Sequence, residues 1–340
     1  MRRKTCFILA ILTCAVCAVF YFTLTKNSKR SLNPGSMTQP ESVAIDYSKR
    51  VPVANNRGRA VLDGFQGEVH PVLQRKSNLE VTAALNFDRN QSGDITFLHS
   101  WPFEVNDLFL SLNLSILTKA YSERDFSRFL PEKELGAVGQ MWALDPEKVA
   151  EFLKQFHPNP SMRLVARGRR AGPDGAFAIL RAVSPSHLDI LFRVHAEFDV
   201  VPDHEKWKSF VSEAWFSPAY FLGRMVINRE AGTVEYFRLG IPTDTRLNVH
   251  ITAANEREEG HGWMHIDSME LTGGNADDLG KMRWVDQIET TDANERLAKV
   301  FYKFKEIDWV TFDRVQELAR EKKKPIFIVA AMGTLDDQTC

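Results

Sequence analysis

Cysteine is almost absent from this sequence, and the few cysteines are unevenly placed. Cys6, Cys14 and Cys17 lie among the first 20 residues, and Cys340 is the last residue. The long stretch between Cys17 and Cys340 has none, so no disulfide can form within it. The folded part must therefore be held together by its hydrophobic core, even if it works in an oxidising compartment.

The sequence also lacks an excess of charge of either sign. It has 43 basic and 44 acidic residues and a net charge of −1. Domains that bind nucleic acid usually carry a basic excess, so nucleic acid is not expected as a partner. Tandem repeats, a Ser-His-Asp signature, a phosphate loop and a dinucleotide fingerprint are missing as well. What remains is a chain of 340 residues, 44% of them hydrophobic, which suffices for about two domains.

One long hydrophobic run stands near the N-terminus. Residues 6–25 carry no charge and have three basic residues on either side, and about 20 apolar residues are enough to span a bilayer. The run is longer than a typical signal-peptide core, and no small-residue cleavage pattern closes it. We predict an uncleaved signal anchor within residues 1–30, with a cleaved signal peptide as the alternative. Cys14 and Cys17 have redox-motif spacing, but a thiolate is costly inside a membrane, so they are interpreted as ordinary membrane-helix residues.

The orientation of the span is not decided by the basic residues, because the two flanks carry the same number. Two N-glycosylation triplets, at Asn90 and Asn113, favour a body in the lumen. Residues 31–75 are polar, contain several prolines and show no helical period. They are typical of a flexible tether between the membrane and a folded domain.

Residues 76–290 are predicted to form a β-rich antiparallel domain of about eight strands. Residues 187–201 give the clearest pattern, since Phe192, Val194 and Phe198 alternate with charged residues such as Arg193 and His195. Such alternation is typical of one strand with a buried face and a solvent face. A helix is expected to start at Asp145-Pro146, and further strands at 79–87, 108–117, 162–166, 176–183, 222–228, 233–241, 246–252 and 263–271.

Residues 291–340 change character. Two helices are predicted at 295–307 and 310–323, followed by a continuous apolar strand at 326–331 and a short polar loop that leads to Cys340. This order is how a thioredoxin-like unit leads into its redox motif, with the thiol at the start of a helix that favours thiolate. The predicted fold class is therefore α+β: a single-pass membrane helix, a β-rich antiparallel lumenal domain and a partial thioredoxin-like α-β unit. Cys340 is the candidate catalytic residue, and a stray thiol is the alternative.

Two further patterns are possible metal sites. Asp88, Asn90, Ser92 and Asp94 match the first ligand positions of a calcium loop, but the last position is His99 where a bidentate Glu is needed. A polar turn is the favoured interpretation, and calcium binding is doubtful. His195, His250 and His265 lie on predicted strands, with Glu197 and Asp267 two residues from the first and the last. They are expected to be ordinary polar-face residues, with a metal site as the less favoured alternative.

Several short segments carry a family resemblance in the same order along residues 78–340. They are residues 128–131, 156–158, 192–198, 215–221, 237–242, 247–249 and 333–340. Together they resemble the selenoprotein N family. The resemblance implies a protein of the endoplasmic reticulum membrane and a selenocysteine, encoded by UGA, directly after Cys340. Reading UGA as stop would end the product at Cys340, and we expect this shortened form to be inactive.

The same resemblance implies a thiol/selenol oxidoreductase that protects against oxidation and regulates calcium uptake, with the calcium pump of the endoplasmic reticulum as partner. No cofactor is expected in this chain itself. The alternative is a non-catalytic, membrane-tethered β-rich domain that binds a partner protein through an exposed sheet. A UGA codon after codon 340 favours the enzyme, and a UAA or UAG codon favours the interaction domain.

Overall fold

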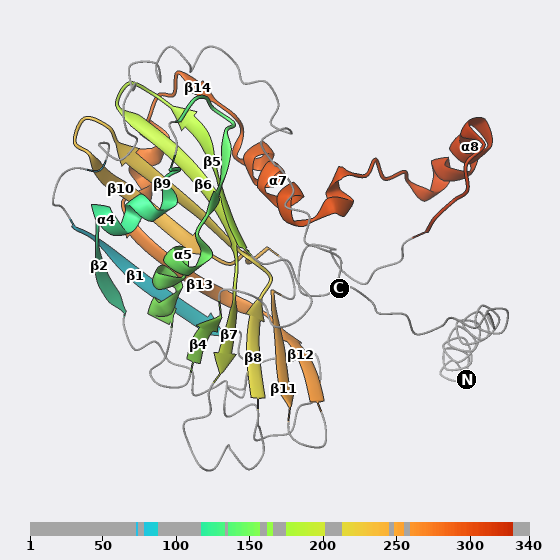
Figure 1. Ribbon diagram of the computed structural model, residues 1–340, viewed down its shortest axis with the longest axis horizontal. Helices are drawn as coiled ribbons and strands as arrows, with labels where there is room; N and C mark the ends of the chain where they lie inside the picture. The colour runs from blue at the N-terminus through green and yellow to red at the C-terminus, as the bar shows by residue number, and fades with distance from the viewer. Residues whose placement is uncertain are drawn as a thin grey trace, which may run out of the picture. The chain divides into compact units, whose positions relative to one another are not determined.

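The computed structural model describes a β-rich antiparallel domain with few helices (Figure 1). The described residues are 73, 78–87, 117–132, 135–156, 162–165, 175–200, 213–244, 248–254 and 259–328. All of them belong to one compact unit, Arg50–Cys340. The predicted calcium loop, both glycosylation triplets, the predicted strand at 108–117 except for its last residue, the apolar run at 6–25 and Cys340 lie outside the described residues.

The larger of two sheets has nine strands, all paired antiparallel. Its order is β14-β5-β6-β9-β10-β13-β1-β2, with β3 added beside β5. The strands are β1 (Asn78–Phe87), β2 (Thr118–Ser122), β3 (Met141–Leu144), β5 (Gly175–Val183), β6 (His187–His195), β9 (Phe221–Asn228), β10 (Thr233–Gly240), β13 (Ile266–Gly274) and β14 (Asp286–Gln287). The predicted strands at 79–87, 176–183, 222–228 and 233–241 are confirmed within one or two residues.

The smaller sheet has five strands in the order β12-β11-β8-β7-β4. They are β4 (Met162–Val165), β7 (Glu197–Val200), β8 (Glu213–Pro218), β11 (Val249–Ala254) and β12 (Glu259–Met264). The described residues therefore hold more strands than the eight expected, because short strands such as β2, β3 and β12 carry no clear alternation.

Three connections of one or two residues join the two sheets. Ala196 separates β6 from β7, Ala219 and Tyr220 separate β8 from β9, and His265 separates β12 from β13. The prediction of one strand over 187–201 is thus wrong, as is that over 263–271. Each stretch is interrupted at a single residue, Ala196 or His265, and continues in the other sheet. The alternation of apolar and polar residues continues across this interruption, so the sequence does not reveal the change of sheet.

Hydrogen bonds of Asn248 link the segments that meet at this junction between the sheets. It is fully buried, its side-chain nitrogen donates to the carbonyl oxygens of Pro242 (3.0 Å) and Ile266 (2.9 Å), and its side-chain oxygen accepts from the Ile266 backbone nitrogen at 2.8 Å. The Asn248 carbonyl also accepts from the Ala219 nitrogen at 3.0 Å. A buried amide with all of these partners orders two crossing strands at once.

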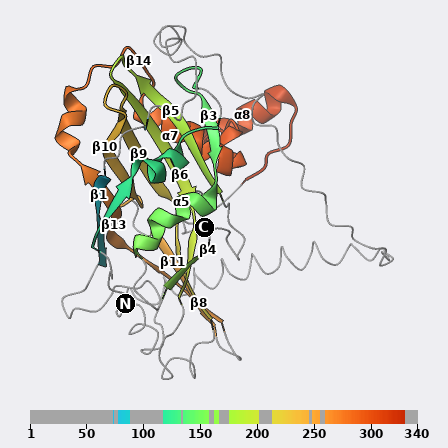
Figure 2. The ribbon, with the colours of Figure 1, turned by 60° about the vertical axis from the view of Figure 1, so that its left-hand side comes forward.

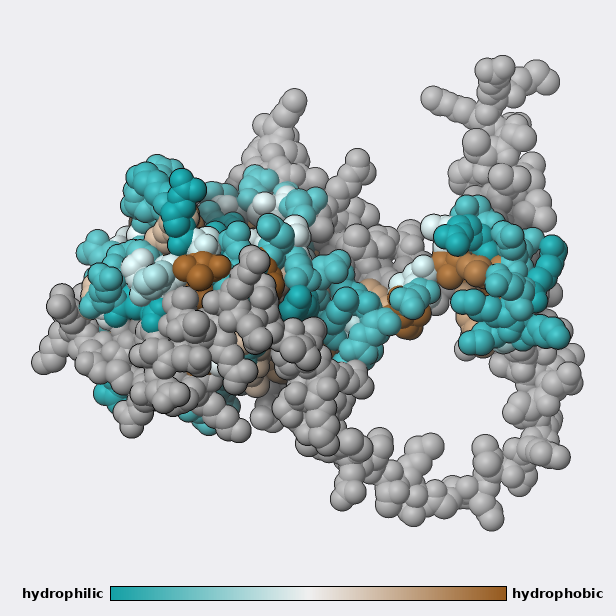
Figure 3. All heavy atoms as spheres, turned by 90° about the horizontal axis from the view of Figure 1, so that it is seen from above, coloured by the Kyte–Doolittle hydropathy of each residue, from teal (hydrophilic) through white to brown (hydrophobic). Residues whose placement is uncertain are grey.

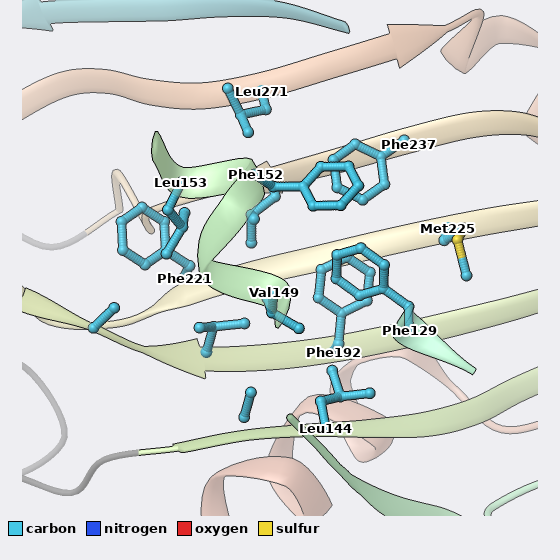
Figure 4. Packing of buried hydrophobic residues seen from close by; sticks show 14 of the residues in the cluster. Phe129, Leu144, Val149, Phe152, Leu153, Phe192, Phe221, Met225, Phe237 and Leu271 are labelled. Atoms are coloured by element: carbon cyan, nitrogen blue, oxygen red, sulfur yellow. The ribbon is translucent and has the colours of Figure 1, made fainter. Parts of the chain in front are cut away.

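The inner face of the nine-stranded sheet is covered by α4 (Glu123–Phe126) and α5 (Pro146–Leu153), which η3 (Ser127–Phe129) and η4 (Lys154–Phe156) extend. The predicted start of α5 is confirmed, because the Asp145 carboxylate accepts from two backbone nitrogens of the first turn. Figure 4 shows the rings of Phe129, Phe152, Phe192 and Phe237 gathered between the helices and the sheet. All four are fully buried, so this face forms the main core.

Gly223 makes room for one of these rings. It pairs with Phe192 across β6 and β9, and a Cβ atom at Gly223 would stand 1.8 Å from the Phe192 ring. Only a residue without a side chain lets the Phe192 ring lie flat over the neighbouring strand. The aromatic core therefore depends on a glycine as well as on phenylalanines.

The outer face of the same sheet is covered near β5 and β6 by α7 (Thr290–Phe301). Ile179 and Leu191 of the sheet pack against Ala293 and Leu297 of this helix. The expected solvent face of β6 is therefore buried, and Arg193 and His195 are 2% and 6% exposed. This second layer could not be predicted from local sequence patterns, because α7 is far from β6 in the chain. Figure 2 shows the sheet and these helices from a second side.

The C-terminal residues differ in surface character from the body. Beyond η5 (Ala276–Lys281) and α7 come η6 (Lys303–Glu306) and α8 (Phe312–Lys322). The helix predicted at 310–323 is confirmed as α8, whereas the helix predicted at 295–307 starts earlier, at Thr290, and ends at Phe301. No residue of α8 is buried. Figure 3 shows hydrophobic side chains among mostly hydrophilic ones at the surface, and most of the exposed large apolar residues lie between Ile307 and Ile328. Ile326–Ile328, the described part of the predicted last strand, are not in a strand, because a strand requires a paired neighbour.

Candidate functional site

A buried pair of polar side chains lies at the end of β6, beside the junction of the two sheets. Arg193 and His195 are two residues apart, so both point to the outer face of the sheet, as the sequence predicted. The Arg193 Nε donates to the His195 Nε2 at 3.0 Å. The alternation of β6 therefore places a guanidinium and an imidazole side by side, under the end of α7.

Aromatic rings surround this pair. The guanidinium carbon of Arg193 lies 3.5 Å from the ring centre of Tyr220 and 5.1 Å from that of Tyr302. The His195 ring lies 4.1 Å from the Phe301 ring, centre to centre. Tyr220 comes from the β8–β9 connection, and Phe301 and Tyr302 come from the C-terminal end of α7. Two separate segments thus meet over one arginine of β6.

The charge of Arg193 has no acidic partner among the described residues. Its Nη2 is buried and makes no hydrogen bond. Ring faces attract a cation, and the C-terminal end of a helix carries a partial negative charge, so Tyr220 and α7 offset part of the cost of burial. A buried ion without a counter-ion still costs free energy, which makes this pair an unusual feature of the core.

His195 is neutral in this environment. Burial, and after it the nearby charge of Arg193, holds the pKa of His195 well below its usual value of 6.5. Because the Nε2 accepts a hydrogen bond from Arg193, the proton of the neutral ring is on Nδ1. The pair supplies a fixed cation and a neutral imidazole whose Nε2 lone pair accepts the hydrogen bond from Arg193. Its contacts with Phe301 and Tyr302 are suited to positioning α7 on the sheet.

A second charged cluster lies on the same face, further along β6. Asp189 is fully buried and accepts from Arg181 Nε at 2.5 Å and from Arg224 Nη2 at 2.7 Å, both on Oδ2. Arg224 Nε reaches the other carboxylate oxygen at 3.0 Å, and Arg181 Nη1 donates to the Ile288 carbonyl at 3.3 Å. This cluster ties β5, β6, β9 and the segment before α7 together.

The three histidines considered as a metal site do not come together. His195 contacts Arg193, His265 lies 3.5 Å from Asp267, and His250 contacts His261. Within the part of the chain that the structure describes, no group of three or more His, Cys, Asp or Glu residues could hold a metal ion. The three side chains therefore do not form one cluster, and His195 is buried instead of lying on a solvent-exposed face.

Several residues of these clusters were missed from the sequence. Tyr220 and His261 gave no signal, because their partners come from distant segments. The Asp189 cluster could have been suspected, since Asp189 stands between the apolar residues Leu188 and Ile190 and a buried carboxylate requires a cation. Among the described residues no helix is long and apolar enough to cross a membrane.

Comparisons with known proteins give one consistent result. No protein-family model and no solved structure matches the chain. Selenoprotein N of Danio rerio is 25% identical over 281 residues, which cover 66% of this chain and 48% of that protein. Selenoprotein N of Mus musculus and of Homo sapiens are each 26% identical, over 65% of this chain and 47% and 44% of their own lengths.

The described residues define a two-sheet, β-rich antiparallel domain whose buried polar groups hold helices and strands in place. By sequence this is a selenoprotein N-like protein. The chain spans about half the length of the curated relatives that it matches. The segments of the resemblance contain core and junction residues, among them Phe129, Phe192, Tyr220, Phe237 and Asn248.

Proposed function

We propose that this chain acts as a thiol/selenol oxidoreductase of the endoplasmic reticulum, anchored by residues 1–30 with its body in the lumen. The observation that carries the proposal is its similarity to selenoprotein N over about two thirds of its length. By the same resemblance its role is redox protection and regulation of calcium uptake, with the calcium pump of this membrane as partner. Calcium binding at Asp88, Asn90, Ser92 and Asp94 is not part of the proposal, because the pattern lacks its last ligand.

The proposed chemistry resides at Cys340 and a selenocysteine that follows it. A selenol supplies a strong nucleophile toward the sulfur of a substrate disulfide. Cys340 then acts as the resolving thiol, so that the substrate gains two electrons and two protons and leaves as two thiols. Cys340 and its neighbour lose these electrons and protons and become joined by an S–Se bond. A dithiol reductant must reduce this bond before the next cycle.

The described domain supports this proposal as a scaffold. Arg193, Tyr220 and His195 pack against the end of α7, and the chain continues from there through η6 and α8 toward Cys340. The exposed apolar side chains between Ile307 and Ile328 are of the kind that the remainder of a thioredoxin-like unit would cover. In this proposal the β-rich domain positions the redox unit and contributes no catalytic group of its own.

The experiment compares three forms of the protein, two of which are extended beyond residue 340. One carries selenocysteine after Cys340, the second adds Cys340→Ser, and the third is the 340-residue form. We expect disulfide reduction, at equal amounts of soluble protein and with a dithiol reductant, from the first form alone. Equal activity of all three would refute the assignment of the chemistry to Cys340 and its neighbour.

The location of the body is tested separately. Protease added to intact microsomes should leave residues after 30 intact, and glycosidase should shift the mobility if Asn90 or Asn113 carries a glycan. Loss of the body to external protease would contradict a lumenal orientation. This result would leave the redox proposal standing, because it concerns topology and not chemistry.

A second candidate function is a membrane-tethered interaction domain without catalysis. The observation that favours it is the set of exposed apolar residues near α8, which include Trp309, Phe312 and Phe327. A partner protein would cover such a surface as readily as the rest of a redox unit. The messenger separates the two candidates. A UGA after codon 340 with an open frame and a selenocysteine-insertion hairpin supports the oxidoreductase, and a UAA or UAG supports the interaction domain.

A further inference from the structure

Two histidines face each other on the hairpin formed by β11 and β12. Thr252 is the residue opposite His261, and His250 is opposite Trp263, so His250 and His261 are diagonal neighbours on the same face of the five-stranded sheet. The His261 Nδ1 and the His250 Nε2 are 3.3 Å apart. The two rings are almost parallel, with an angle of 10° between their planes and 5.3 Å between their centres.

The distance between the two nitrogens is compatible with a shared metal ion as well as with a hydrogen bond. The separation of 3.3 Å lies just above the range of about 2.7–3.2 Å that is usual for a hydrogen bond donated by N–H to oxygen. Zinc binds imidazole nitrogen at about 2.0–2.1 Å with tetrahedral angles, which places two such ligands about 3.3–3.4 Å from each other. The two nitrogens therefore already stand at the separation of two ligands on one tetrahedral ion.

The surroundings keep this pair in place and leave it accessible. The Trp263 ring stacks on His250, 5.2 Å away from centre to centre, which limits rotation of the imidazole. β12 is an edge strand of its sheet, His261 is exposed and His250 is half-buried. The Thr252 hydroxyl lies 3.5 Å from the His261 Nδ1, where it can hydrogen-bond to a water on a bound ion. A cation can thus reach the pair without opening the core.

We propose that His250 and His261 bind a borderline transition-metal cation, with zinc as the best fit, through Nε2 and Nδ1. Imidazole prefers zinc, copper or nickel over the hard cations calcium and magnesium, which take oxygen ligands. The described residues place no third protein ligand at this pair. In this proposal the remaining coordination positions are filled by water or by further side chains. This site is independent of the redox chemistry proposed at Cys340.

Zinc titration of the full chain in detergent, followed by calorimetry, tests the site. All four cysteines are first blocked by alkylation, because thiolates bind zinc strongly. We expect His250→Gln and His261→Gln each to weaken zinc binding at least about tenfold, since loss of even a second-shell partner costs about 10–100-fold. His187→Gln is the matched control, because His187 lies on the other sheet and contacts Glu235.

The outcomes separate a built site from general histidine binding. Equal zinc affinity of wild type and His261→Gln would overturn the proposal, and so would an equal loss in His187→Gln. His261 is exposed, so its substitution should not unfold the domain, and circular dichroism of each variant checks this. Cobalt gives a second readout, since a tetrahedral Co²⁺ spectrum should appear in wild type and be lost in both variants. An octahedral spectrum that all variants share would also refute the site.

Discussion

The two faces of the nine-stranded sheet are built from the same strands but are stabilised in different ways. On the inner face, Phe152 of α5 packs against Phe129 and Phe237, with ring centres 5.0 and 5.1 Å apart. On the outer face, the residues next in sequence to the core residues include Asp189 and Arg193, which are equally buried. One strand, β6, therefore buries phenylalanine on one side and charge on the other.

The difference shows which interactions supply stability and which supply position. Apolar burial is favourable at about 25 cal/mol per Å² and tolerates changes of shape. A buried ion pair contributes little net free energy to folding, but each charge in it requires its opposite charge at a fixed position. The inner face accordingly supplies most of the stability. The outer face fixes where α7, and with it the C-terminal segment, lies on the sheet.

The largest expected effect comes from the inner face. Phe192→Ala should lower the free energy of unfolding by about 3–5 kcal/mol, because the ring is fully buried and leaves a cavity. Leu191→Ala is the matched control on the outer face, where the small cluster with α7 can collapse more easily, and it should cost about 2–3 kcal/mol. Urea unfolding followed by tryptophan fluorescence measures both. A loss below about 1 kcal/mol for Phe192→Ala would mean that this face is not the core.

Asp189→Asn on the outer face should cost about 3 kcal/mol. The change removes the one buried carboxylate between Arg181 and Arg224, and breaking a buried pair costs about 3–5 kcal/mol. The partial exposure of Arg224 reduces this figure. Glu270→Gln is the control, since its ion pair with Arg238 is exposed and should be worth about 0–1 kcal/mol. Equal losses in the two variants would contradict the special role of the buried cluster.

The sequence predicted the inner face well because alternation records it directly. Phe192, Val194 and Phe198 are buried as expected, and Asp145 caps its helix. The interruptions at Ala196 and His265 could not be predicted, since a strand that changes sheets keeps its period of two. The β-rich class thus follows from local pattern, whereas the division into two sheets depends on contacts between distant residues.

For the outer face, the sequence predicted which side chains of β6 lie there but not that they are buried. Arg193 and His195 share a face, as the spacing requires, but polar residues at every second position predict solvent and not a covering helix. Only α7 changes this, and its contacts with β5 and β6 are separated by about a hundred residues of sequence. The pairing of His250 with His261 depends likewise on the register of β11 and β12, which no local pattern specifies. The redox site at Cys340 stays a prediction.

An acidic pH should weaken the outer face and leave the inner face unaffected. The pKa of His195 is well below 6.5 in the folded protein because of burial, and the unfolded chain takes up the proton at about 6.5. The contribution of neutral His195 to the free energy of unfolding is therefore fully present above this pH. It is lost as the pH drops below it, by at most about 1.4 kcal/mol per pH unit. His195→Gln keeps an acceptor for Arg193 and should lose this slope between pH 6.5 and 5. An unchanged slope in the variant would mean that another group titrates in this window.

The smallest effect is expected from Arg193→Met, and it sharpens the comparison most. Asp189 is a buried charge with two partners, whereas Arg193 is a buried charge with none among the described residues. The substitution removes the attraction to Tyr220, worth up to about 2 kcal/mol, and the hydrogen bond to His195. It also removes the cost of keeping an unpaired cation out of water, and methionine fills a similar volume. These terms oppose each other, so the free energy of unfolding should change by less than about 1 kcal/mol.

Arg193→Lys should cost more, because it keeps the charge but cannot stack on Tyr220 or reach His195 in the same geometry. If urea unfolding instead shows Arg193→Met to be the more damaging of the two, Arg193 must have a counter-ion, and its role would be to bind that anion and not to position α7.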